Sequence, residues 1–386
     1  MRVAVVGAGI VGLSIAFELS KSDTDVVVFE RNRRVGRGAT AAALGGITPQ
    51  SESLCRGPLR HIATWSAELY GSYIDEICIA SGLDIPVVSS GQLQVALSDA
   101  EFNALVAGIL PVWAAEGFTT HALNRAETLD REPLLGPKVA GSLLLPIEIA
   151  LEPAQLVDGL LACLNRRAQV SIHSGTWVVD VLSDERSATV IISDGSRWPF
   201  DIVVLASGLA TRQLSPLVAP KLYGMRGQAM EMKTGSAGYV LNHHIYAANG
   251  GHGRSAYLVP RSDGRVAMGV TYEPHKEVRG TIESDIRAMI DGCSDVCPAV
   301  RSWQEIRRWS GIRPASVDGR PFIGPLGEFG RTIVCAGHQG LGVTLAPISA
   351  HLVRTLCDLV PLGDLSRVGE RERLAFTVCS PSRDVG

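Results

Sequence analysis

The chain has 386 residues, of which 46% are hydrophobic and 19% are charged, and its formal net charge at pH 7 is −3. This length and composition favour about two domains of a soluble globular protein. The small negative charge argues against a nucleic-acid partner or an anionic membrane surface, and no apolar run reaches the roughly 18 residues of a membrane span.

Three glycines near the N-terminus, Gly7, Gly9 and Gly12, stand in G-x-G-x-x-G spacing. An apolar run precedes them, a segment with helical apolar spacing follows, and a second apolar run ends at Glu30. A strand, a glycine turn, a helix and a second strand with a terminal acid form a dinucleotide-binding βαβ unit, whose helix N-terminus faces the pyrophosphate. Glu30 would accept hydrogen bonds from a ribose diol and repel a 2′-phosphate, which favours FAD or NAD over NADP.

The same N-terminus has a second interpretation, a secretory signal peptide, because an arginine precedes the apolar run. Glycines interrupt that run, Glu18 follows it and no small-x-small cleavage site is present, so we do not favour this interpretation. The eight cysteines are scattered, and without a secretory signal we expect reduced thiols in a cytoplasmic protein. Cys293 and Cys297 are the only close pair, and no flanking histidine or second pair supports a zinc site.

The segment after Glu30, residues 31–52, is rich in glycine and alanine, which indicates that its backbone approaches a ligand closely. Helices are then predicted over residues 59–81 and 101–116, with a half-buried strand over residues 91–98 between them. Another helix begins near Pro153. Alternating strands follow it, with a turn at Asp194 and Gly195. An apolar strand over residues 202–205 ends before Ser207 and Gly208.

From residue 239 onward the pattern predicts a hairpin, with strands over residues 257–260 and 266–271 around a turn at residues 262–264. A helix is predicted over residues 281–290. Proline and glycine recur around Arg313, and residues 331–357 predict a strand, a glycine loop and a helix. We expect the two strand–glycine–helix units to meet at one ligand, and the alternating middle segments to form a separate, mostly antiparallel sheet.

These segments together resemble the D-amino acid oxidase superfamily of FAD-dependent amine oxidases (the DAO family), and most of all its glycine oxidase branch. The stretches that carry the resemblance span nearly the whole chain: VGAGIVGLSIAFELS, the pair Glu30-Arg31, GATAAALGGITPQSE, YLVPRSDGRVAMGVT, GIRPASVDGRPFIGP and AGHQGLGVTLAP.

The resemblance implies an α/β fold with an α+β second domain. A Rossmann-like FAD-binding domain would be joined to a substrate domain built on a mostly antiparallel sheet. We place the discontinuous FAD-binding domain at residues 1–85, 145–220 and 318–370, and the substrate-binding domain at residues 86–144 and 221–317. Residues 371–386 would form a C-terminal tail.

The resemblance also implies that the cofactor is FAD and that it is not covalently bound. Relatives that tether FAD use a cysteine ahead of the C-terminal signature, and the segment that starts at Trp309 has none there. Gly340 and Gly342 would open a helix whose N-terminus faces the flavin and stabilises its reduced, anionic form. The residues that we assign to the cofactor are Gly7, Gly9, Ile10, Val11, Gly12, Glu30, Arg31, Ala39, Thr40, Leu44, Gly45, Gly46, Val179, Ser207, Gly208, His338, Gly340, Leu341, Gly342, Val343 and Thr344.

Arg313 is the residue that we expect to bind the substrate carboxylate, because a fixed guanidinium suits bidentate capture of such a group. The alternatives are a surface arginine or one paired with Asp318, and the family motif G-[IL]-R-P-x-x-x-D-G favours the first assignment. Tyr257 aligns with the family's substrate-contacting tyrosine, against the alternative of a half-buried sheet tyrosine. Arg313 and Tyr257 are therefore the predicted catalytic and substrate-binding residues.

The predicted reaction is the oxidative deamination or dealkylation of an amino acid, glycine or an N-substituted glycine. A hydride passes to flavin N5, water hydrolyses the imine, and O2 reoxidises the flavin to give H2O2; no protein base is obligatory. One alternative is a dehydrogenase that passes electrons to a quinone or a partner protein. Another is a flavoprotein that acts on hydroxy acids instead of amines. No nucleic acid partner is expected, and the oligomeric state stays open, a homo-oligomer included.

Two departures from the glycine oxidase pattern bear on the substrate. Those enzymes usually carry methionine where Gly46 stands and an arginine–asparagine pair where Gly340 and Leu341 stand. We expect the loss of bulk and charge at Gly46 and Gly340, which we assign to the substrate pocket, to give room for an N-substituted glycine or a larger amino acid. His243, His244 and His252 are placed at a lid or entrance.

Overall fold

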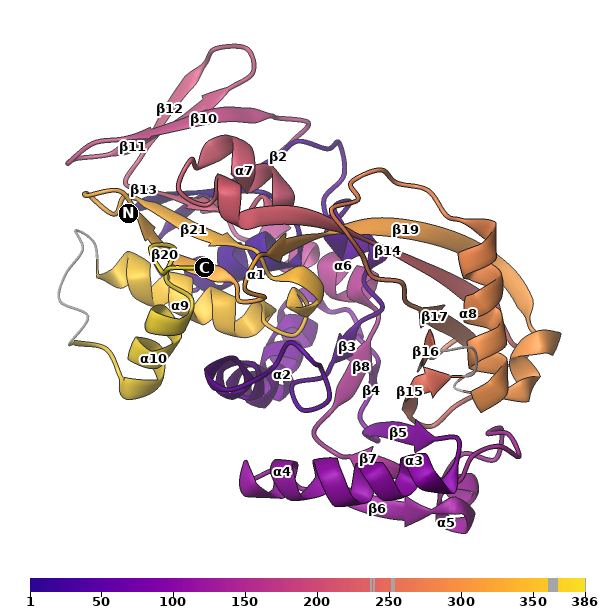
Figure 1. Ribbon diagram of the computed structural model, residues 1–386. Helices are drawn as coiled ribbons and strands as arrows, with labels where there is room; N and C mark the ends of the chain where they lie inside the picture. Colours follow the sequence, from indigo (N-terminus) through magenta and orange to yellow (C-terminus); the bar gives the residue numbers. More distant parts are fainter. Residues whose placement is uncertain (237, 239, 251–253, 360–366, 386) are drawn as a thin grey trace.

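A six-stranded, mostly parallel sheet brings the glycine-rich segments of the two chain ends together (Figure 1). The computed structural model describes residues 1–386 except 237, 239, 251–253, 360–366 and 386, so His252 lies outside the described residues. In spatial order the strands are β20 (Phe322–Leu326), β21 (Thr332–Ala336), β13 (Ile202–Leu205), β1 (Arg2–Val6), β2 (Asp25–Glu30) and β9 (Val170–Ser174). Only β20 runs antiparallel to its neighbour in this sheet.

The alternation of side chains along β1 explains why both faces of this sheet are covered. Val3 and Val5 belong to the core that the helices share, whereas Ala4 and Val6 face the opposite layer. The helices of the first layer are α1 (Ile10–Leu19), α2 (Pro58–Ser81), α6 (Pro153–Asn165), α9 (Ala346–Asp358) and α10 (Glu370–Val378). The predicted helix over residues 59–81 is confirmed as α2, which starts at a proline and ends at Gly82 with a φ of 68°.

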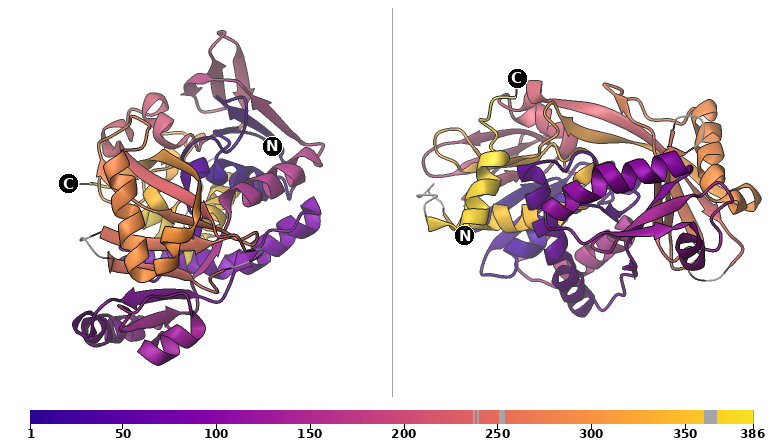
Figure 2. Two further views of the ribbon diagram at one scale, coloured as in Figure 1. Left: turned by 90° about the vertical axis from the view of Figure 1, so that its right-hand side faces the viewer. Right: turned by 60° about the horizontal axis from the view of Figure 1, so that its bottom comes forward.

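The opposite layer is a three-stranded antiparallel meander that stands out from the rest of the chain (Figures 1 and 2). It consists of β10 (Val178–Ser183), β11 (Ala188–Ile192) and β12 (Arg197–Phe200), and the short helix α7 (Thr211–Leu214) lies nearby. The predicted turn at Asp194 is confirmed, because its Oδ1 accepts a hydrogen bond from the Ser196 N–H at 2.8 Å and Gly195 has a φ of 88°.

A nine-stranded, mostly antiparallel sheet carries the middle of the chain. Helix α8 (Glu283–Val296) packs on one of its faces, and α3 (Asp99–Ala104), α4 (Leu110–Ala115) and α5 (Arg125–Arg131) cover the end formed by β5–β7 (Figure 1). The predicted hairpin is confirmed, with Tyr257 opposite Gly269 in antiparallel register. The strands are β5 (Gln92–Ala96), β6 (His121–Asn124), β7 (Gly141–Leu145), β14 (Leu222–Lys233), β15 (His244–Gly250), β16 (Arg254–Pro260), β17 (Arg265–Gly269), β18 (Glu273–Pro274) and β19 (Gln304–Ser316).

A small fourth sheet connects these parts. It consists of β3 (Gly46–Ile47), β8 (Ile149–Leu151) and β4 (Val87–Val88). Because β3 continues the small-residue segment that follows β2, this sheet fixes the course of that segment between the two large sheets.

The segment around Arg313 forms a long strand, which the prolines and glycines of the sequence do not predict, with one irregularity in its pairing, at Ile306. Residues Gln304–Ser316 form β19 and pair with β14 along their length, with Arg313 opposite Met225. Pro314 has no backbone N–H to donate. It is tolerated because, among the described residues, β19 forms a ladder with β14 only, as an edge strand does, so the sheet loses no hydrogen bond between two central strands.

The expected C-terminal tail is packed onto the body of the protein. Helix α10 buries Phe376 against the helical layer, and the guanidinium of Arg383 lies 2.7 Å from the Asp318 carboxylate. Asp318 is therefore paired with Arg383 and Arg320, and it does not pair with Arg313. In the part of the chain that the structure describes, none of the helices has the length and apolarity of a membrane span.

Candidate active site

A cavity of about 540 Å³ lies at the carboxyl ends of the parallel strands and continues onto the nine-stranded sheet. Ligands of open α/β sheets bind at this edge. Gly7 follows β1, Glu30 ends β2 and Ser207 follows β13, and all three line the cavity. Its far wall includes Tyr257 and Arg313 from the nine-stranded sheet, so one continuous space joins the predicted nucleotide and substrate residues.

The glycine turn after β1 leaves no room for side chains. Gly7 has a φ of 109° and its N–H donates to the Phe29 carbonyl at 2.7 Å. A Cβ on Gly7 would lie 2.5 Å from the Ala206 carbonyl oxygen, and one on Gly12 would lie 1.9 Å from the Gly7 oxygen. Gly12 does not itself line the cavity. It allows the close contact between the helix and the turn.

Polar contacts position the start of α1 and the end of β2 at the cavity. The Glu30 carboxylate accepts hydrogen bonds from the Ala8 N–H at 2.9 Å and from the Asn32 N–H at 2.8 Å. The Thr40 hydroxyl accepts a hydrogen bond from the Ile10 N–H at 3.0 Å, which satisfies a donor in the first turn of the helix. The segment around Thr40 is thus attached to the turn that it faces.

Most of the predicted cofactor residues line this one cavity, and four do not. Val179 points outward with 39% of its surface exposed, while its neighbour Val178 is buried and lines the cavity, because successive side chains of β10 alternate between its faces. Leu341 and Thr344 are buried behind the lining. The residues that do line it are Gly7, Gly9, Ile10, Val11, Glu30, Arg31, Ala39, Thr40, Leu44, Gly45, Gly46, Ser207, Gly208, His338, Gly340, Gly342 and Val343.

The C-terminal glycine loop differs from the expected helix start. A 3₁₀ turn forms at Gln339–Leu341, and α9 begins only at Ala346, so Gly340 and Gly342 precede the helix and do not open it. Gln339 has a φ of 48°, which interrupts a continuous helix. His338 is buried, its Nε2 lies 3.0 Å from the Ser349 hydroxyl, and burial lowers its pKa to about 4, so the imidazole is neutral at pH 7.

Arg313 projects from β19 into the cavity with most of its hydrogen-bonding capacity free. One N–H donates to the Thr271 carbonyl at 3.1 Å, and the guanidinium carbon lies 4.8 Å from the centre of the Tyr272 ring. No carboxylate of the described residues forms an ion pair with it, so the remaining N–H groups are available to an anion. Burial lowers the pKa of Arg313, while Tyr272 and Glu52 oppose that shift.

Tyr257 and Gly46 are in direct contact across the cavity. A Cβ on Gly46 would lie 2.0 Å from the Tyr257 hydroxyl oxygen, so this hydroxyl occupies the space that a side chain would fill. The expected room at Gly46 is therefore absent. At Gly340 a Cβ would meet only the Arg313 side chain, at 4.0 Å, which leaves that position open.

The two histidines placed at an entrance are buried instead. His243 is 5% exposed and its Nδ1 lies 2.8 Å from the Glu132 carboxylate. His244 lies behind Tyr257, with Nδ1 3.3 Å from the tyrosine hydroxyl, and burial lowers its pKa to about 3. His244 begins β15 and contacts Tyr257, whereas His243 lies just before β15 and contacts Glu132.

Several lining residues escaped the sequence analysis: Glu52, Gln92, Tyr246, Tyr272 and Arg279. Glu52 ends the stretch GATAAALGGITPQSE. Its place at the end of the small-residue segment could have indicated that it lies at the ligand cavity. Tyr246 and Gln92 come from paired strands, β15 and β5, that are far apart in the sequence, and no local pattern predicts that pairing.

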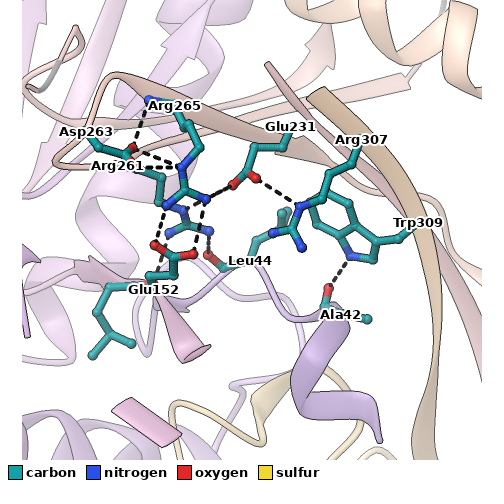
Figure 3. A network of polar contacts seen from close by, with 10 residues as sticks. Ala42, Leu44, Glu152, Glu231, Arg261, Asp263, Arg265, Arg307 and Trp309 are labelled. Atoms are coloured by element: carbon teal, nitrogen blue, oxygen red, sulfur yellow. Dashed lines mark hydrogen bonds and ion pairs between the residues drawn. The ribbon is translucent and has the colours of Figure 1, made fainter. Parts of the chain in front are cut away.

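A charged network fixes the segment after the 3₁₀ turn Ala39–Ala42 to the nine-stranded sheet (Figure 3). Buried Arg261 donates to the Leu44 carbonyl at 2.7 Å and to the Leu151 carbonyl at 3.1 Å. Arg265 lies 3.0 Å from buried Glu231 and 2.9 Å from Glu152. The network therefore determines where the backbone of residues 42–46 runs along the cavity.

The residues of the cavity fit FAD. Gly7 and Gly12 keep backbone free of side chains beside the helix start, as a pyrophosphate requires, and the Glu30 carboxylate supplies acceptors for a ribose. The described residues hold no group of three histidine, cysteine or acidic side chains placed for an ion, and their eight cysteines form no disulfide.

Comparison with known proteins agrees with this geometry. The model of the FAD dependent oxidoreductase family (DAO) matches residues 2–356. The glycine oxidase of Geobacillus kaustophilus (strain HTA426) is 29% identical over 378 residues, which cover 95% of this chain and 97% of that protein. The glycine oxidase of Bacillus subtilis (strain 168) is 25% identical over 91% of each chain. The crystal structure of the Geobacillus kaustophilus enzyme superimposes with a TM-score of 0.84 at 27% identity, covering 95% of this chain and all of that one.

Proposed function

Because the chain belongs to the DAO family of FAD-dependent oxidoreductases, we propose that its cavity oxidises the amine of a small amino acid or N-substituted glycine, with O2 as the electron acceptor. The protein is an FAD-dependent amino acid or amine oxidase of the glycine oxidase type. One observation carries the proposed substrate class. Arg313 has no carboxylate partner among the described residues, and it faces the same cavity as the glycine turn between β1 and α1.

Arg313 and Tyr257 orient the substrate. The guanidinium binds the carboxylate with N–H groups that the protein does not use, and the Tyr257 hydroxyl donates a further hydrogen bond. Burial raises the pKa of Tyr257 well above 10, so its hydroxyl keeps its proton at all relevant pH values. Bound FAD supplies the two-electron acceptor for the α C–H bond of the substrate.

No charged base is needed beside the reacting carbon. The buried imidazoles of His244 and His338 are neutral at pH 7, since their pKa values lie near 3 and 4. The chain holds the substrate by its carboxylate, which positions the amine for reaction. The buried walls of the cavity keep water away from the amine, which favours its neutral form. The substrate amine loses its proton to solvent, and water hydrolyses the imine product.

The open position at Gly340 supports a substrate larger than glycine. A Cβ there would have no neighbour closer than 4.0 Å, whereas the space at Gly46 is filled by Tyr257. An N-substituent or a side chain would therefore extend past Gly340 and Arg313, not past Gly46.

Anaerobic titration of the yellow holoprotein tests this function. Glycine, sarcosine, D- and L-amino acids, N-carboxymethyl amino acids and hydroxy acids are added in turn, and the oxidised flavin band is followed. We expect amines larger than glycine to bleach the band and admission of air to restore it with formation of H2O2. Bleaching by hydroxy acids alone would overturn the proposed substrate class. Slow reoxidation in air would show that O2 is not the electron acceptor and that another acceptor takes its place.

A further inference from the structure

Two opposite charges face the cavity without pairing. Arg313 is the cation, and Glu52, on the segment between β3 and α2, is the anion. Oε1 of Glu52 accepts hydrogen bonds from the Ser53 hydroxyl at 3.1 Å and the Leu54 N–H at 3.3 Å. Its Oε2 accepts none from the described residues, and no ion pair joins Glu52 to a described cation. A half-buried carboxylate with a free oxygen at a binding cavity is suited to a cationic ligand group.

The backbone that carries Glu52 is held in place. Buried Glu148 accepts hydrogen bonds from the Gln50 N–H at 3.0 Å, the Ser51 N–H at 2.6 Å and the Ser51 hydroxyl at 2.8 Å. The Gln92 side chain, which also lines the cavity, donates to the Ser51 hydroxyl at 2.9 Å. Glu52 is therefore a positioned residue, and a positioned charge binds a ligand at a lower entropic cost than a mobile one.

Aromatic side chains line the same cavity as Glu52. Tyr246 and Tyr272 both face it, and Tyr246 lies edge-on to Tyr257 with ring centres 6.3 Å apart. Tyr272 is 54% exposed, whereas burial and then the charge of Glu52 raise the pKa of Tyr246. A cavity lined by both a carboxylate and tyrosine rings is a favourable environment for a cation.

The α-amine of the substrate is a poor match for this carboxylate. A negative charge beside the amine would stabilise its protonated form, whereas the proposed reaction uses the neutral amine. A group that stays charged throughout the reaction has no such conflict. Arg279 also lines the cavity, but its side chain is exposed and it has no described contact with Arg313, Glu52 or Tyr272, which places its charge at the rim.

We propose that Glu52, which faces the same cavity as Tyr246 and Tyr272, binds a second, positively charged group of the substrate while Arg313 binds its carboxylate. The preferred substrates are then amino acids or N-substituted glycines that carry a distal cation. This inference rests on the proposed function, because it assumes that a carboxylate occupies Arg313.

Binding of non-oxidisable ligands to the holoenzyme tests the inference without turnover. Three ω-amino carboxylates, from 3-aminopropanoate to 5-aminopentanoate, are compared with carboxylates of the same length that end in methyl, by calorimetry and by perturbation of the flavin spectrum. We expect at least one ammonium ligand to bind about tenfold or more tightly than its methyl analogue, which corresponds to about 1.4 kcal/mol. In Glu52→Gln this ratio should fall close to one, and Arg279→Gln, the matched control, should retain it.

Turnover supplies a second readout. Lysine is compared with its neutral analogue norleucine, each as the D and L form, and kcat/KM should favour lysine in the wild type and lose that preference in Glu52→Gln. Equal binding of every ligand pair, or a ratio that survives Glu52→Gln, would overturn the role of Glu52. If Arg313→Met instead leaves the binding of the methyl-ended carboxylates unchanged, the carboxylate anchor of the proposed function is itself wrong.

Discussion

The guanidinium of Arg313 occupies the space in which a side chain on Gly227 would lie. A Cβ on Gly227 would come within 2.2 Å of Nη1 and 2.6 Å of Cζ. Gly227 lies on β14 two residues from Met225, which pairs with Arg313, so the two positions share one face of the sheet. The absence of a side chain at Gly227 on β14 therefore decides where the Arg313 guanidinium on β19 can lie.

Gly227→Ala should displace this guanidinium while leaving the cofactor site intact. We expect kcat/KM for the amino acid substrate to fall by roughly 10- to 100-fold, mainly through KM, because a misplaced anchor loses its bidentate geometry. FAD content and the visible spectrum should not change. Gly71→Ala in α2, where a Cβ would meet nothing within 4 Å, is the control. Unchanged kinetics of Gly227→Ala would show that Arg313 does not bind the substrate at this place.

Gly46 and Tyr257 should show strong energetic coupling. Gly46→Ala would place a methyl group 2.0 Å from the Tyr257 hydroxyl oxygen but 3.3 Å from the ring carbon that carries it. Tyr257→Phe removes the clash together with the hydroxyl. We expect each single variant to lower substrate affinity and the double variant to be no worse than Gly46→Ala alone. Additive losses in this double-mutant cycle would mean that the two residues do not compete for one space.

Arg261 should stabilise both the fold and the bound cofactor through residues 42–46 (Figure 3). Arg261→Met leaves the Leu44 and Leu151 carbonyls without this donor, and we expect a loss of about 3 kcal/mol in the free energy of unfolding together with weaker FAD retention. Thermal denaturation and the flavin content after dialysis measure the two effects. Arg307→Gln is the control, since Arg307 reaches the same Glu231 from a side chain that is 53% exposed. Equal losses in both variants would contradict a specific role for Arg261.

Glu148 should make stability depend on pH. Burial raises its pKa from 4.5 to about 8, so the folded protein keeps a proton that the unfolded chain releases between these values. Stability should therefore fall as pH rises from about 4.5 to 8 and level off above that, by up to roughly 5 kcal/mol. Glu148→Gln can keep the contacts to Gln50 and Ser51 without titrating. Chemical denaturation at pH 5.5 and 8.5 should show a smaller pH effect in the variant, and an equal effect would place the pKa of Glu148 near its ordinary value.

The nucleotide end of the site is the part that the sequence predicted best. The G-x-G-x-x-G turn, the acid at the end of β2 and the helix α2 follow from local pattern, because steric needs of a turn and apolar periodicity act over a few residues. The family resemblance then placed Arg313 and Tyr257 at one cavity. The hairpin of β16 and β17 was also predictable from its turn residues.

Errors arose where a long-range partner overrides a local pattern. Prolines and glycines around Arg313 suggested no strand, yet β14 provides a ladder for Gln304–Ser316. The strand register of β10 turned Val179 outward and Val178 inward. Gly46 suggested free space, but the Tyr257 hydroxyl from a strand far along the chain fills it. Each of these outcomes depends on which distant backbone lies opposite.

The sequence by itself determined the dinucleotide turn and the family, and it singled out Arg313 for the proposed carboxylate anchor, because each depends on residue types at short spacings. Only the tertiary structure decided that Glu52 and Tyr246 face the same cavity as Arg313, and that Gly227 leaves room for the guanidinium. Those relationships arise from strand pairing and packing between segments up to about 260 residues apart in the chain. Because such pairing minimises the free energy of the whole fold, no short stretch of sequence contains it.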